Sequence, residues 1–295
     1  MVFEDIAYAV DGPVATISFA RPEVMNAARN ETHLELQAAL DAADRDDAVR
    51  AVIVTGTGRA FCAGTDISDG FRLPAGGDPA TGEGVPADVG GVTVLRLFRM
   101  RKPVIAAING AAAGFGATFT LAMDIRLAAE TAKFAFPFTR RGICAESCSS
   151  WFLPRLVGMQ TAQDWMLTGR TFPASEALAR GLVHELLAAE DLLPRARALA
   201  LDIAENCAPV SVALNRQLLW RMMGADHPEI AHALESRAVA ARMASDDVRE
   251  GVDSFKERRA PRFGDGLADA PYMTAWWPDL KAQGCGATET EELKA

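Results

Sequence analysis

Short apolar runs divide the first half of this chain. The segments 51–55, 104–108 and 125–129 consist almost entirely of Ala, Val, Ile and Leu. Strands buried on both faces have this pattern, whereas half-exposed strands alternate apolar and polar positions. Residues 8–10 and 14–19 do alternate, and Asp-Gly-Pro separates them, which favours a turn. The pattern therefore predicts two strands joined by a turn, followed by three buried strands.

Apolar residues at helical spacing fill the intervals between these strands and continue beyond them. The predicted helices cover residues 31–45, 92–100, 116–123, 160–168, 174–180, 190–222 and 228–260, and residues 182–187 indicate the end of a strand. Alternating strands and helices are typical of an α/β fold. We therefore expect an α/β core over residues 1–200 and a helical region over 201–264 that packs against a partner subunit.

The remaining tail, residues 265–295, ends in a polar stretch that we expect to be partly disordered. Trp276 and Trp277 are expected to anchor it to the body of the protein or to a neighbouring subunit. A second unusual segment, residues 67–91, is rich in Gly and Pro and has little apolar periodicity. A long loop inside a compact domain is either functional or disordered, and both alternatives stay open here.

Composition and charge narrow the class of protein. The chain has 295 residues, 49% of them hydrophobic and 23% charged, which is ordinary for a soluble globular protein. Its net charge of −9 argues against a nucleic-acid partner. No apolar run is long enough to span a membrane, and no signal region is apparent. The five cysteines lack the spacing of a metal site or a disulfide framework, so we expect no metal and a cytoplasmic location.

The stretch 102–124 carries the first sign of chemistry. Its buried strand leads through Asn109-Gly110 and Gly114-Phe115-Gly116 into an apolar segment that is predicted to be helical. Glycines permit a sharp turn and close approach to a ligand. The first N–H groups of a helix have no internal acceptor and carry partial positive charge. The stretch therefore suits an oxygen that carries negative charge, although a tight connection without any ligand has the same pattern.

A second segment supports the ligand interpretation. Residues 61–66 read Phe-Cys-Ala-Gly-Thr-Asp and follow the buried strand at 51–55. The two segments together resemble the crotonase (enoyl-CoA hydratase/isomerase) superfamily, and the resemblance covers roughly residues 5–264. It implies an α/β, crotonase-like spiral of ββα units with a C-terminal helical trimerisation region. The expected assembly is a homotrimer or a hexamer formed by two trimers.

The resemblance also implies a substrate and an oxyanion site. The substrate is an acyl-CoA thioester, so coenzyme A belongs to the substrate and no separate cofactor is expected. The backbone N–H groups of Ala63 and Phe115 match the two donors of the family's oxyanion hole. The residues expected to contact the substrate or its CoA moiety are Met25, Ala27, Ala63, Gly64, Thr65, Asp66, Gly114, Thr118, Phe138, Phe255 and Arg258. For two groups of these residues a role without a ligand is also open. Residues 21–27 suit a plain loop, and residues 255–258 suit an ordinary amphipathic helix.

The residues at the expected catalytic positions differ from those of the family's hydratases. Hydratases of the family use two glutamates to activate water, and these positions correspond to Thr118 and Phe138. Neither side chain acts as a general base near neutral pH. Glu146 instead matches the single catalytic glutamate of peroxisomal-type Δ3,Δ2-enoyl-CoA isomerases. Burial would raise its pKa and a nearby helix N-terminus would lower it, and the sequence does not decide between them.

Three functions therefore remain open at this stage. The favoured one is an enoyl-CoA isomerase in which Glu146 shuttles a proton while the oxyanion hole holds the enolate. The second is an enoyl-CoA hydratase, or another enzyme of the superfamily, that recruits water through Glu146 and Thr118. The third is a non-catalytic acyl-CoA-binding protein, in which Glu146 is only a carboxylate near a helix start.

Overall fold

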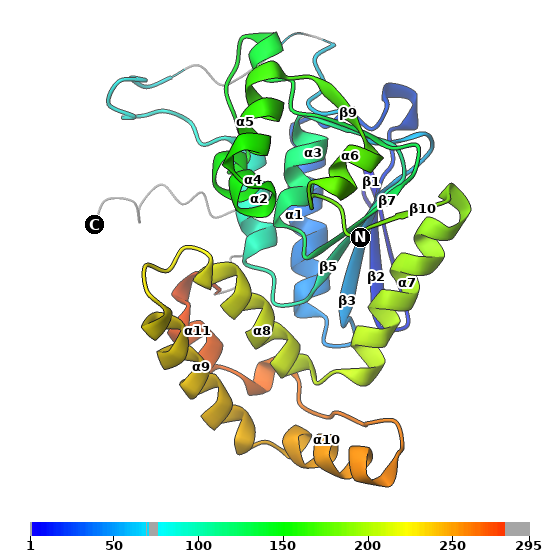
Figure 1. Ribbon diagram of the computed structural model, residues 1–295, viewed down its shortest axis with the longest axis vertical. Helices are drawn as coiled ribbons and strands as arrows, with labels where there is room; N and C mark the ends of the chain where they lie inside the picture. The colour runs from blue at the N-terminus through cyan, green and yellow to red at the C-terminus, as the bar shows by residue number, and fades with distance from the viewer. Residues whose placement is uncertain (1, 69, 71–75, 281–295) are drawn as a thin grey trace.

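The computed structural model describes residues 2–68, 70 and 76–280. A six-stranded sheet forms the centre, in the order β1-β2-β3-β5-β7-β10 (Figure 1). These strands are Ile6–Asp11, Val14–Phe19, Ala51–Gly56, Val104–Ile108, Ile125–Ala129 and Glu185–Leu187. β1 and β2 form an antiparallel hairpin, and the other pairings are parallel. All the predicted strands are confirmed.

A second sheet has four strands in the order β4-β6-β8-β9. Its strands are Ala60–Cys62, Ala111–Ala113, Lys133–Ala135 and Thr171–Pro173. The sequence analysis missed all four, because a run of three residues carries too little periodicity to be recognised. β4 pairs in parallel with β6, which brings the turns that follow these two strands together. This pairing builds the site described below.

Helices pack on the sheets and form the C-terminal region. They are α1 Asn30–Arg45, α2 Val89–Phe98, α3 Phe115–Thr118, α4 Ser149–Val157, α5 Met159–Thr168, α6 Ala174–Ala179, α7 Ala189–Asn206, α8 Pro209–Met222, α9 Pro228–Met243, α10 Asp246–Glu257 and α11 Tyr272–Trp276. Short 3-10 turns are Pro22–Val24, Phe119–Ala122, Thr139–Arg141, Leu267–Asp269 and Pro278–Leu280. The predicted helix at 116–123 is thus one α-helical turn followed by a 3-10 turn.

Two predicted helices are each divided in two, and a third begins earlier than expected. The segment 190–222 breaks before Pro209, which occupies the first turn of α8. The segment 228–260 breaks at Ser245, whose hydroxyl caps α10 by accepting the Val248 N–H at 3.4 Å. α2 starts at Val89 rather than at residue 92, because Asp88 caps it. Helical periodicity alone did not show these breaks.

Burial on both faces explains the apolar strand runs. On one face, Ile53, Ile105 and Leu127 pack with Leu192 and other residues of α7. On the other face, the main core cluster includes residues of α1, α2 and α3. Figure 1 shows α7 running along the sheet. An antiparallel sheet with one solvent-exposed face would instead have alternating apolar and polar residues along its strands.

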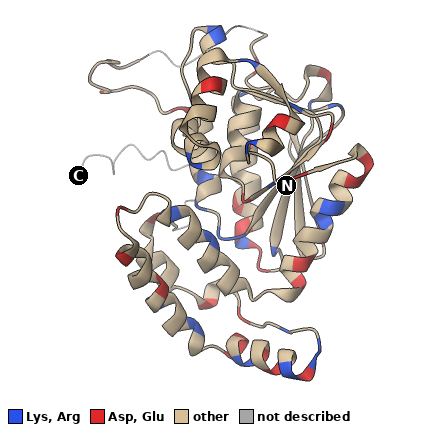
Figure 2. Ribbon diagram, in the orientation of Figure 1, with Lys and Arg blue, Asp and Glu red and all other residues tan. Residues whose placement is uncertain are grey.

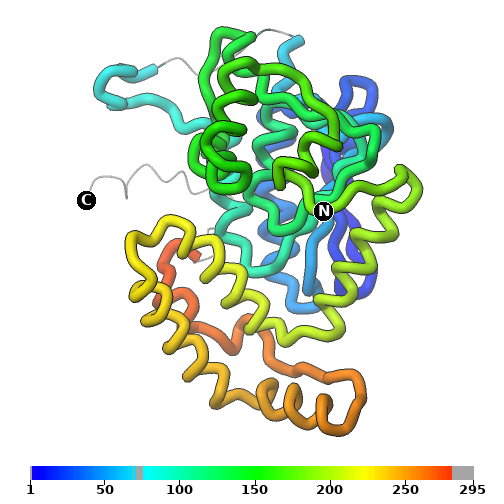
Figure 3. Tube along the Cα trace, viewed as in Figure 1, coloured from blue at the N-terminus to red at the C-terminus, as the bar shows by residue number. Residues whose placement is uncertain are grey.

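The C-terminal helices form a lobe at one end of the molecule (Figures 1 and 3). A separate apolar cluster joins α8, α9 and the tail, and it includes Trp277, which is only 6% exposed. The Arg237 guanidinium lies 4.7 Å from the ring centroid of Trp276. The expected tryptophan anchor is therefore within this chain, and the tail is ordered as far as Leu280. Residues 281–295 lie outside the described part, so the disorder expected there remains a prediction.

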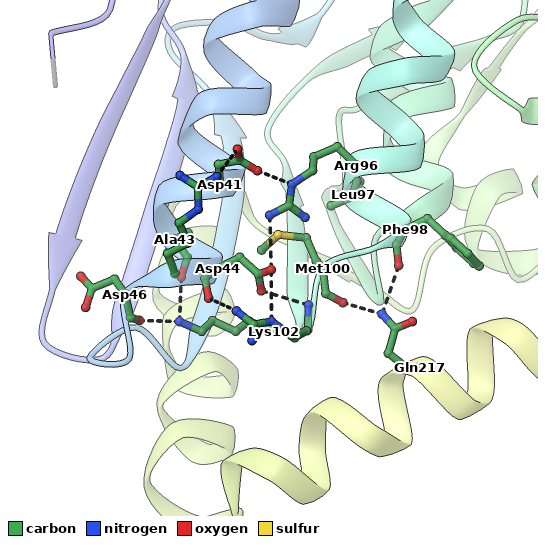
Figure 4. Close-up of polar contacts among 12 residues, drawn as sticks. Asp41, Ala43, Asp44, Asp46, Arg96, Leu97, Phe98, Met100, Lys102 and Gln217 are labelled. Carbon is green, nitrogen blue, oxygen red and sulfur yellow. Dashed lines mark hydrogen bonds and ion pairs between the residues drawn. The ribbon is translucent and has the colours of Figure 1, made fainter. Parts of the chain in front are cut away.

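A buried polar network fixes the strand that leads to the site (Figure 4). Lys102, just before β5, is 4% exposed, and its Nζ donates to the carbonyl of Ala43 at 2.7 Å and to that of Asp46. Gln217 of α8 donates to the Met100 carbonyl at 2.7 Å. These bonds tie the segment between α2 and β5 to α1 and to the C-terminal lobe. Figure 2 shows that charges of both signs are interspersed along the helices.

None of the described helices is both long and apolar enough to cross a membrane. Of the predicted loop at 67–91, residue 69 and residues 71–75 lie outside the described part. Residues 76–88 are exposed and contain only turns and coil, and α2 takes over at Val89.

Candidate active site

Two glycine turns meet at the ends of β4 and β6. Gly64 has φ +104° and Gly114 has φ +50°, so both adopt conformations that other residues avoid. A Cβ on Gly64 would lie 2.9 Å from the Ala113 carbonyl oxygen and 3.7 Å from the Cα of Gly114. Only glycine at position 64 therefore lets the two turns approach this closely.

Each turn is followed by a backbone N–H without an acceptor among the described residues. Phe115 is the first residue of α3, so its amide has no intrahelical partner. On the other turn, the Ala28 amide donates to Gly64 O and the Asp66 amide donates to Ala28 O, both at 2.8 Å. The Thr65 amide lies between these two bonds and makes none in the part of the chain that the structure describes. Thr65 and Phe115 thus supply two donors from adjacent turns.

This arrangement corrects the predicted donor at Ala63. The Ala63 amide donates to the Met25 carbonyl at 3.0 Å, so it already has an acceptor within the fold. The chain turns at Gly64, whose positive φ changes the direction of the peptide groups that follow. The assignment to Ala63 is therefore wrong for this structure, and Thr65 is the residue of that turn with an available N–H. The amide of Phe115, the other predicted donor, has no backbone acceptor among the described residues, and its role as a donor stays a prediction.

Glu146 lies three residues before α4 and accepts two hydroxyl hydrogen bonds. Thr118 Oγ1 donates to its Oε1 at 2.6 Å, and Ser147 Oγ donates to its Oε2. Thr118 comes from α3, the helix that begins with the Phe115 donor. The carboxylate is thus connected directly to the element that carries one of the two N–H groups. The sequence analysis placed Thr118 and Glu146 in the same site, and the structure brings them into contact.

The surroundings of Glu146 raise its pKa. Burial is the largest cause, the charge of Asp88 adds to it, and the hydrogen bonds from Ser147 and Thr118 act in the opposite direction. The effect of burial on this pKa therefore outweighs that of the two hydrogen bonds. A carboxylate with a raised pKa is a better proton acceptor near neutral pH than an ordinary one.

Aromatic side chains pack at α3. Phe115 is 2% exposed and its ring stacks on Phe119 with 5.2 Å between centroids. Phe138, at the predicted position of a hydratase glutamate, is 4% exposed. Phe136 belongs instead to a stack with Trp165 and Phe172 between the second sheet and α5. An apolar ring at 138 is consistent with a site that holds one carboxylate rather than two.

Sequence analysis missed His33, which packs against the Phe115 ring at 4.3 Å between centroids. His33 is 3% exposed, and burial lowers its pKa to about 4, so the ring is neutral at pH 7. His33 Nδ1 lies at hydrogen-bond distance, 3.2 Å, from Thr93 Oγ1, and the Thr93 hydroxyl also lies 3.0 Å from the Val89 carbonyl oxygen. His33 lies 60 residues from Thr93 in the chain, and no sequence motif connects them.

The residues expected at the CoA moiety divide into two groups. Met25 and Ala27 lie in a turn against the segment that leads to Gly64, and Met25 accepts the Ala63 amide. Asp66, also expected at the substrate, accepts the Ser68 amide at 3.1 Å and pairs with Arg21 at 3.0 Å, so its carboxylate has partners within the fold. Phe255 and Arg258 lie at the end of α10, at the opposite end of the molecule from α3 and α4 (Figure 1). Within the single chain they do not reach Glu146, and their contact with CoA stays a prediction.

A valine at position 118 tests the contact between Thr118 and Glu146. Thr118→Val removes the hydroxyl and keeps the shape, so the carboxylate loses one donor and its pKa rises further. We expect turnover at pH 7 to fall about tenfold and the rising limb of the pH–rate profile to move to higher pH. Thr120→Val is the matched control, because the Thr120 hydroxyl donates to the Ala117 carbonyl at 2.8 Å and not to Glu146. An unchanged profile in Thr118→Val would contradict the assigned contact.

An α/β protein with two backbone donors and a half-buried carboxylate at one site has the groups needed to stabilise an oxyanion and to move a proton next to it. The described residues contain no group of three or more His, Cys, Asp or Glu side chains arranged to hold a metal ion. Comparison with known proteins identifies the family. The family model described as enoyl-CoA hydratase/isomerase matches residues 10–266. The chain therefore belongs to the enoyl-CoA hydratase/isomerase family, within the crotonase superfamily.

Individual relatives agree with this assignment. The chain is 44% identical over 265 residues to enoyl-CoA hydratase AFT3-1 of Alternaria alternata, covering 88% of this chain and 87% of that protein. It is 34% identical over 264 residues to 1,2-epoxyphenylacetyl-CoA isomerase of Escherichia coli (strain K12), covering 89% and 99%. A crystal structure of a probable enoyl-CoA hydratase/isomerase from Mycobacterium abscessus superposes with a TM-score of 0.81 at 35% identity, covering 89% and 99%. The chain is thus similar to proteins named for two kinds of reaction.

Proposed function

We propose that this protein is an enoyl-CoA isomerase that moves a double bond from C3 to C2 of an acyl-CoA thioester. The N–H groups of Thr65 and Phe115 hold the thioester oxygen. Glu146 takes a proton from C2, which gives a dienolate with its negative charge on that oxygen, and returns a proton to C4. The double bond between C3 and C4 is thereby replaced by one between C2 and C3, and no other reactant is consumed.

One observation carries this proposal: the half-buried carboxylate of Glu146 lies in hydrogen-bond contact with the helix that supplies an oxyanion donor. A 1,3-proton shift needs one base that reaches two carbons in turn, whereas the hydratases of the family use two glutamates. The two positions that would hold those glutamates are Thr118 and Phe138, and both side chains are buried. The raised pKa of Glu146 suits a group that must both accept and release a proton.

The proposal predicts the product of a 3-enoyl-CoA. Incubation of the full chain with 3-hexenoyl-CoA should yield 2-hexenoyl-CoA of unchanged mass. The product is detected by the rise in absorbance of the double bond conjugated with the thioester, and by liquid chromatography with mass spectrometry. A parallel incubation with 2-hexenoyl-CoA tests hydration: formation of 3-hydroxyhexanoyl-CoA from it, with no conversion of 3-hexenoyl-CoA, would replace the isomerase assignment by the second candidate. Tight binding with no product from either ester would support a binding protein instead.

The second candidate is an enoyl-CoA hydratase. It is favoured by the names of several relatives, including AFT3-1 and a short-chain-enoyl-CoA hydratase of Clostridium acetobutylicum that is 34% identical. In this mechanism Glu146, with the hydroxyls of Thr118 and Ser147, would orient a water toward C3. Parallel incubations with 3-hexenoyl-CoA and 2-hexenoyl-CoA separate the two reactions, because isomerisation converts the first ester at constant mass and hydration adds the mass of one water to the second.

Assembly into a homotrimer or hexamer also remains part of the proposal. The C-terminal helices α9 and α10 present apolar side chains to solvent in the single chain. The exposed fractions are Ile230 45%, Val239 60%, Met243 69%, Val252 46% and Phe255 84%. An apolar surface of this kind supports an interface between copies of the chain.

A further inference from the structure

Asp88 connects the start of α2 to the segment that carries Glu146. Its Oδ1 accepts the Gly90 amide at 3.0 Å, and its Oδ2 accepts the Gly91 amide at 2.9 Å. Oδ2 also accepts the amide of Ser147 at 2.7 Å, from a residue 59 positions further along the chain. The first two bonds are those of an ordinary helix cap. The third bond has no role in capping, and it holds the residue next to Glu146.

The first turn of α2 packs directly against the Glu146 carboxylate. A Cβ on Gly90 would lie 2.6 Å from Glu146 Oε2 and 2.3 Å from Ser147 Oγ. Glycine at this position is therefore what allows the carboxylate to lie against the helix backbone. Any shift of Ser147 relative to α2 would move Glu146 relative to the surface on which it rests.

The segment that Asp88 holds has an unusual backbone. Ser147 and Cys148 both have φ +55°, a left-handed conformation that is uncommon for residues other than glycine. Such residues persist only where surrounding contacts impose them, and they are frequent at functional sites. On one side the Ser149 amide and hydroxyl bond the Glu146 carbonyl at 3.0 and 2.6 Å. On the other side the contact is the bond from Ser147 to Asp88.

We propose that Asp88 is a positioning residue for the reaction, which holds the Ser147 amide against the first turn of α2 and thereby fixes the carboxylate of Glu146 beside Thr118 and the oxyanion donors. This inference rests on the proposed function, because it assigns Asp88 a role through Glu146. Asp88 is not itself the base: both of its oxygens already accept backbone N–H groups, and a proton there would weaken the bonds that hold the segment.

The charge of Asp88 supplies a second, smaller effect. The titratable groups that interact with Glu146 are Asp88 at the start of α2, Cys62 at the end of β4 and Cys148 beside it. His33 of α1 interacts with Asp88 and is neutral near pH 7. The negative charge of Asp88 raises the pKa of Glu146, in addition to burial. Because Asp88 is exposed on one side, solvent screens this effect, and position is expected to matter more than charge.

Two substitutions separate position from charge. Asp88→Asn keeps one carbonyl oxygen, which can still accept from Gly91 and Ser147, but it removes the charge. Asp88→Ala removes the charge and both oxygens that accept these hydrogen bonds. For the alanine variant we expect the plateau of kcat on 3-hexenoyl-CoA to fall about 100-fold, as for a base displaced by about 1 Å, with KM within about threefold. For the asparagine variant we expect a smaller loss of kcat and a rising limb of the pH–rate profile that moves to lower pH.

Asp202→Asn is the matched control, because Asp202 is an exposed acid on α7 that accepts a hydrogen bond from the Asn206 side chain at 2.8 Å. It should change neither kcat nor the profile. Thermal unfolding of all variants shows whether a loss of activity reflects loss of fold, and soluble Asp88→Asn is the variant to use if Asp88→Ala does not fold. Glu146→Gln runs in parallel: if it keeps activity, the proposed function fails. If Glu146→Gln is inactive while the folded Asp88 variants keep the wild-type kcat and pH profile, only the positioning role is overturned.

Discussion

Glu146→Gln is expected to lower the rate of 3-hexenoyl-CoA isomerisation about 1000-fold or more, because a positioned general base typically contributes 10²–10⁴-fold. Glutamine has nearly the same shape and keeps an oxygen that can accept from Thr118, so the site should stay intact. It cannot take a proton from C2. Binding of the substrate should therefore change by no more than about threefold, since the N–H donors belong to the backbone. Steady-state rates and titration calorimetry with a saturated acyl-CoA measure the two quantities.

The matched control for this variant is Glu205→Gln on α7, which removes an exposed carboxylate. It should retain the wild-type rate. If Glu146→Gln turned over at a rate close to that of Glu205→Gln, Glu146 would not be the base, and the isomerase mechanism described above would have to be abandoned.

Glu146→Gln is also expected to change how the stability of the folded protein depends on pH. The folded pKa of Glu146 is raised, so between its ordinary value and the raised value the folded state binds more protons than the unfolded state. The free energy of unfolding therefore decreases as pH rises through this window. At pH 7 the wild type is less stable by this amount. Glu146→Gln lacks this loss of stability, so its Tm should exceed that of the wild type at pH 7. At a pH below the ordinary value of about 4.3, the difference should disappear.

Gly64→Ala is expected to lower kcat about 100-fold or more, by disturbing the oxyanion donors. A methyl group there meets the Ala113 carbonyl at 2.9 Å, and φ +104° is unfavourable for alanine. The turn must therefore move away from Gly114, and the Thr65 amide moves with it. Loss of a single aimed donor costs about 10²–10³ in kcat in acyl-transfer enzymes. Stopped-flow measurement of the isomerisation rate with saturating substrate detects a loss of this size.

Gly12→Ala is the matched control for Gly64→Ala. Gly12 also has a positive φ, +57°, but a Cβ there meets no atom within 4 Å. Gly12→Ala introduces backbone strain but does not push two turns apart. It should therefore lower Tm and leave kcat unchanged. Equal rates in Gly64→Ala and Gly12→Ala would show that the close approach of the two turns is irrelevant to catalysis.

The sequence predicted the large elements of this fold for a physical reason. The strands of the six-stranded sheet are buried by helices on both sides, so their residues are apolar without alternation, and this signal is strong. The three-residue strands β4, β6, β8 and β9 have no comparable signal, and they form through pairing with one another. The bulky Trp277 in an otherwise polar tail correctly indicated a docking contact.

The site was predictable only in part. Resemblance to a family placed Glu146, Thr118 and the two glycine turns together, but it could not identify which N–H of the first turn is available. That choice depends on the direction of peptide groups around Gly64, which side-chain types do not encode. Asp88 and His33 lay outside every motif, because their contacts with Ser147 and Thr93 span 59 and 60 residues and arise from the packing of α2.

The central claim is that Glu146 removes a proton next to a thioester whose oxygen is held by the two backbone donors. Proton exchange at the α-carbon of butyryl-CoA in D2O, followed by mass spectrometry, tests it most directly because it needs neither a double bond nor a water molecule as reactant. We expect the wild type to incorporate deuterium and Glu146→Gln to incorporate none above the rate without protein. Deuterium uptake that persists in Glu146→Gln, or no uptake in the folded wild type with bound butyryl-CoA, would contradict the claim.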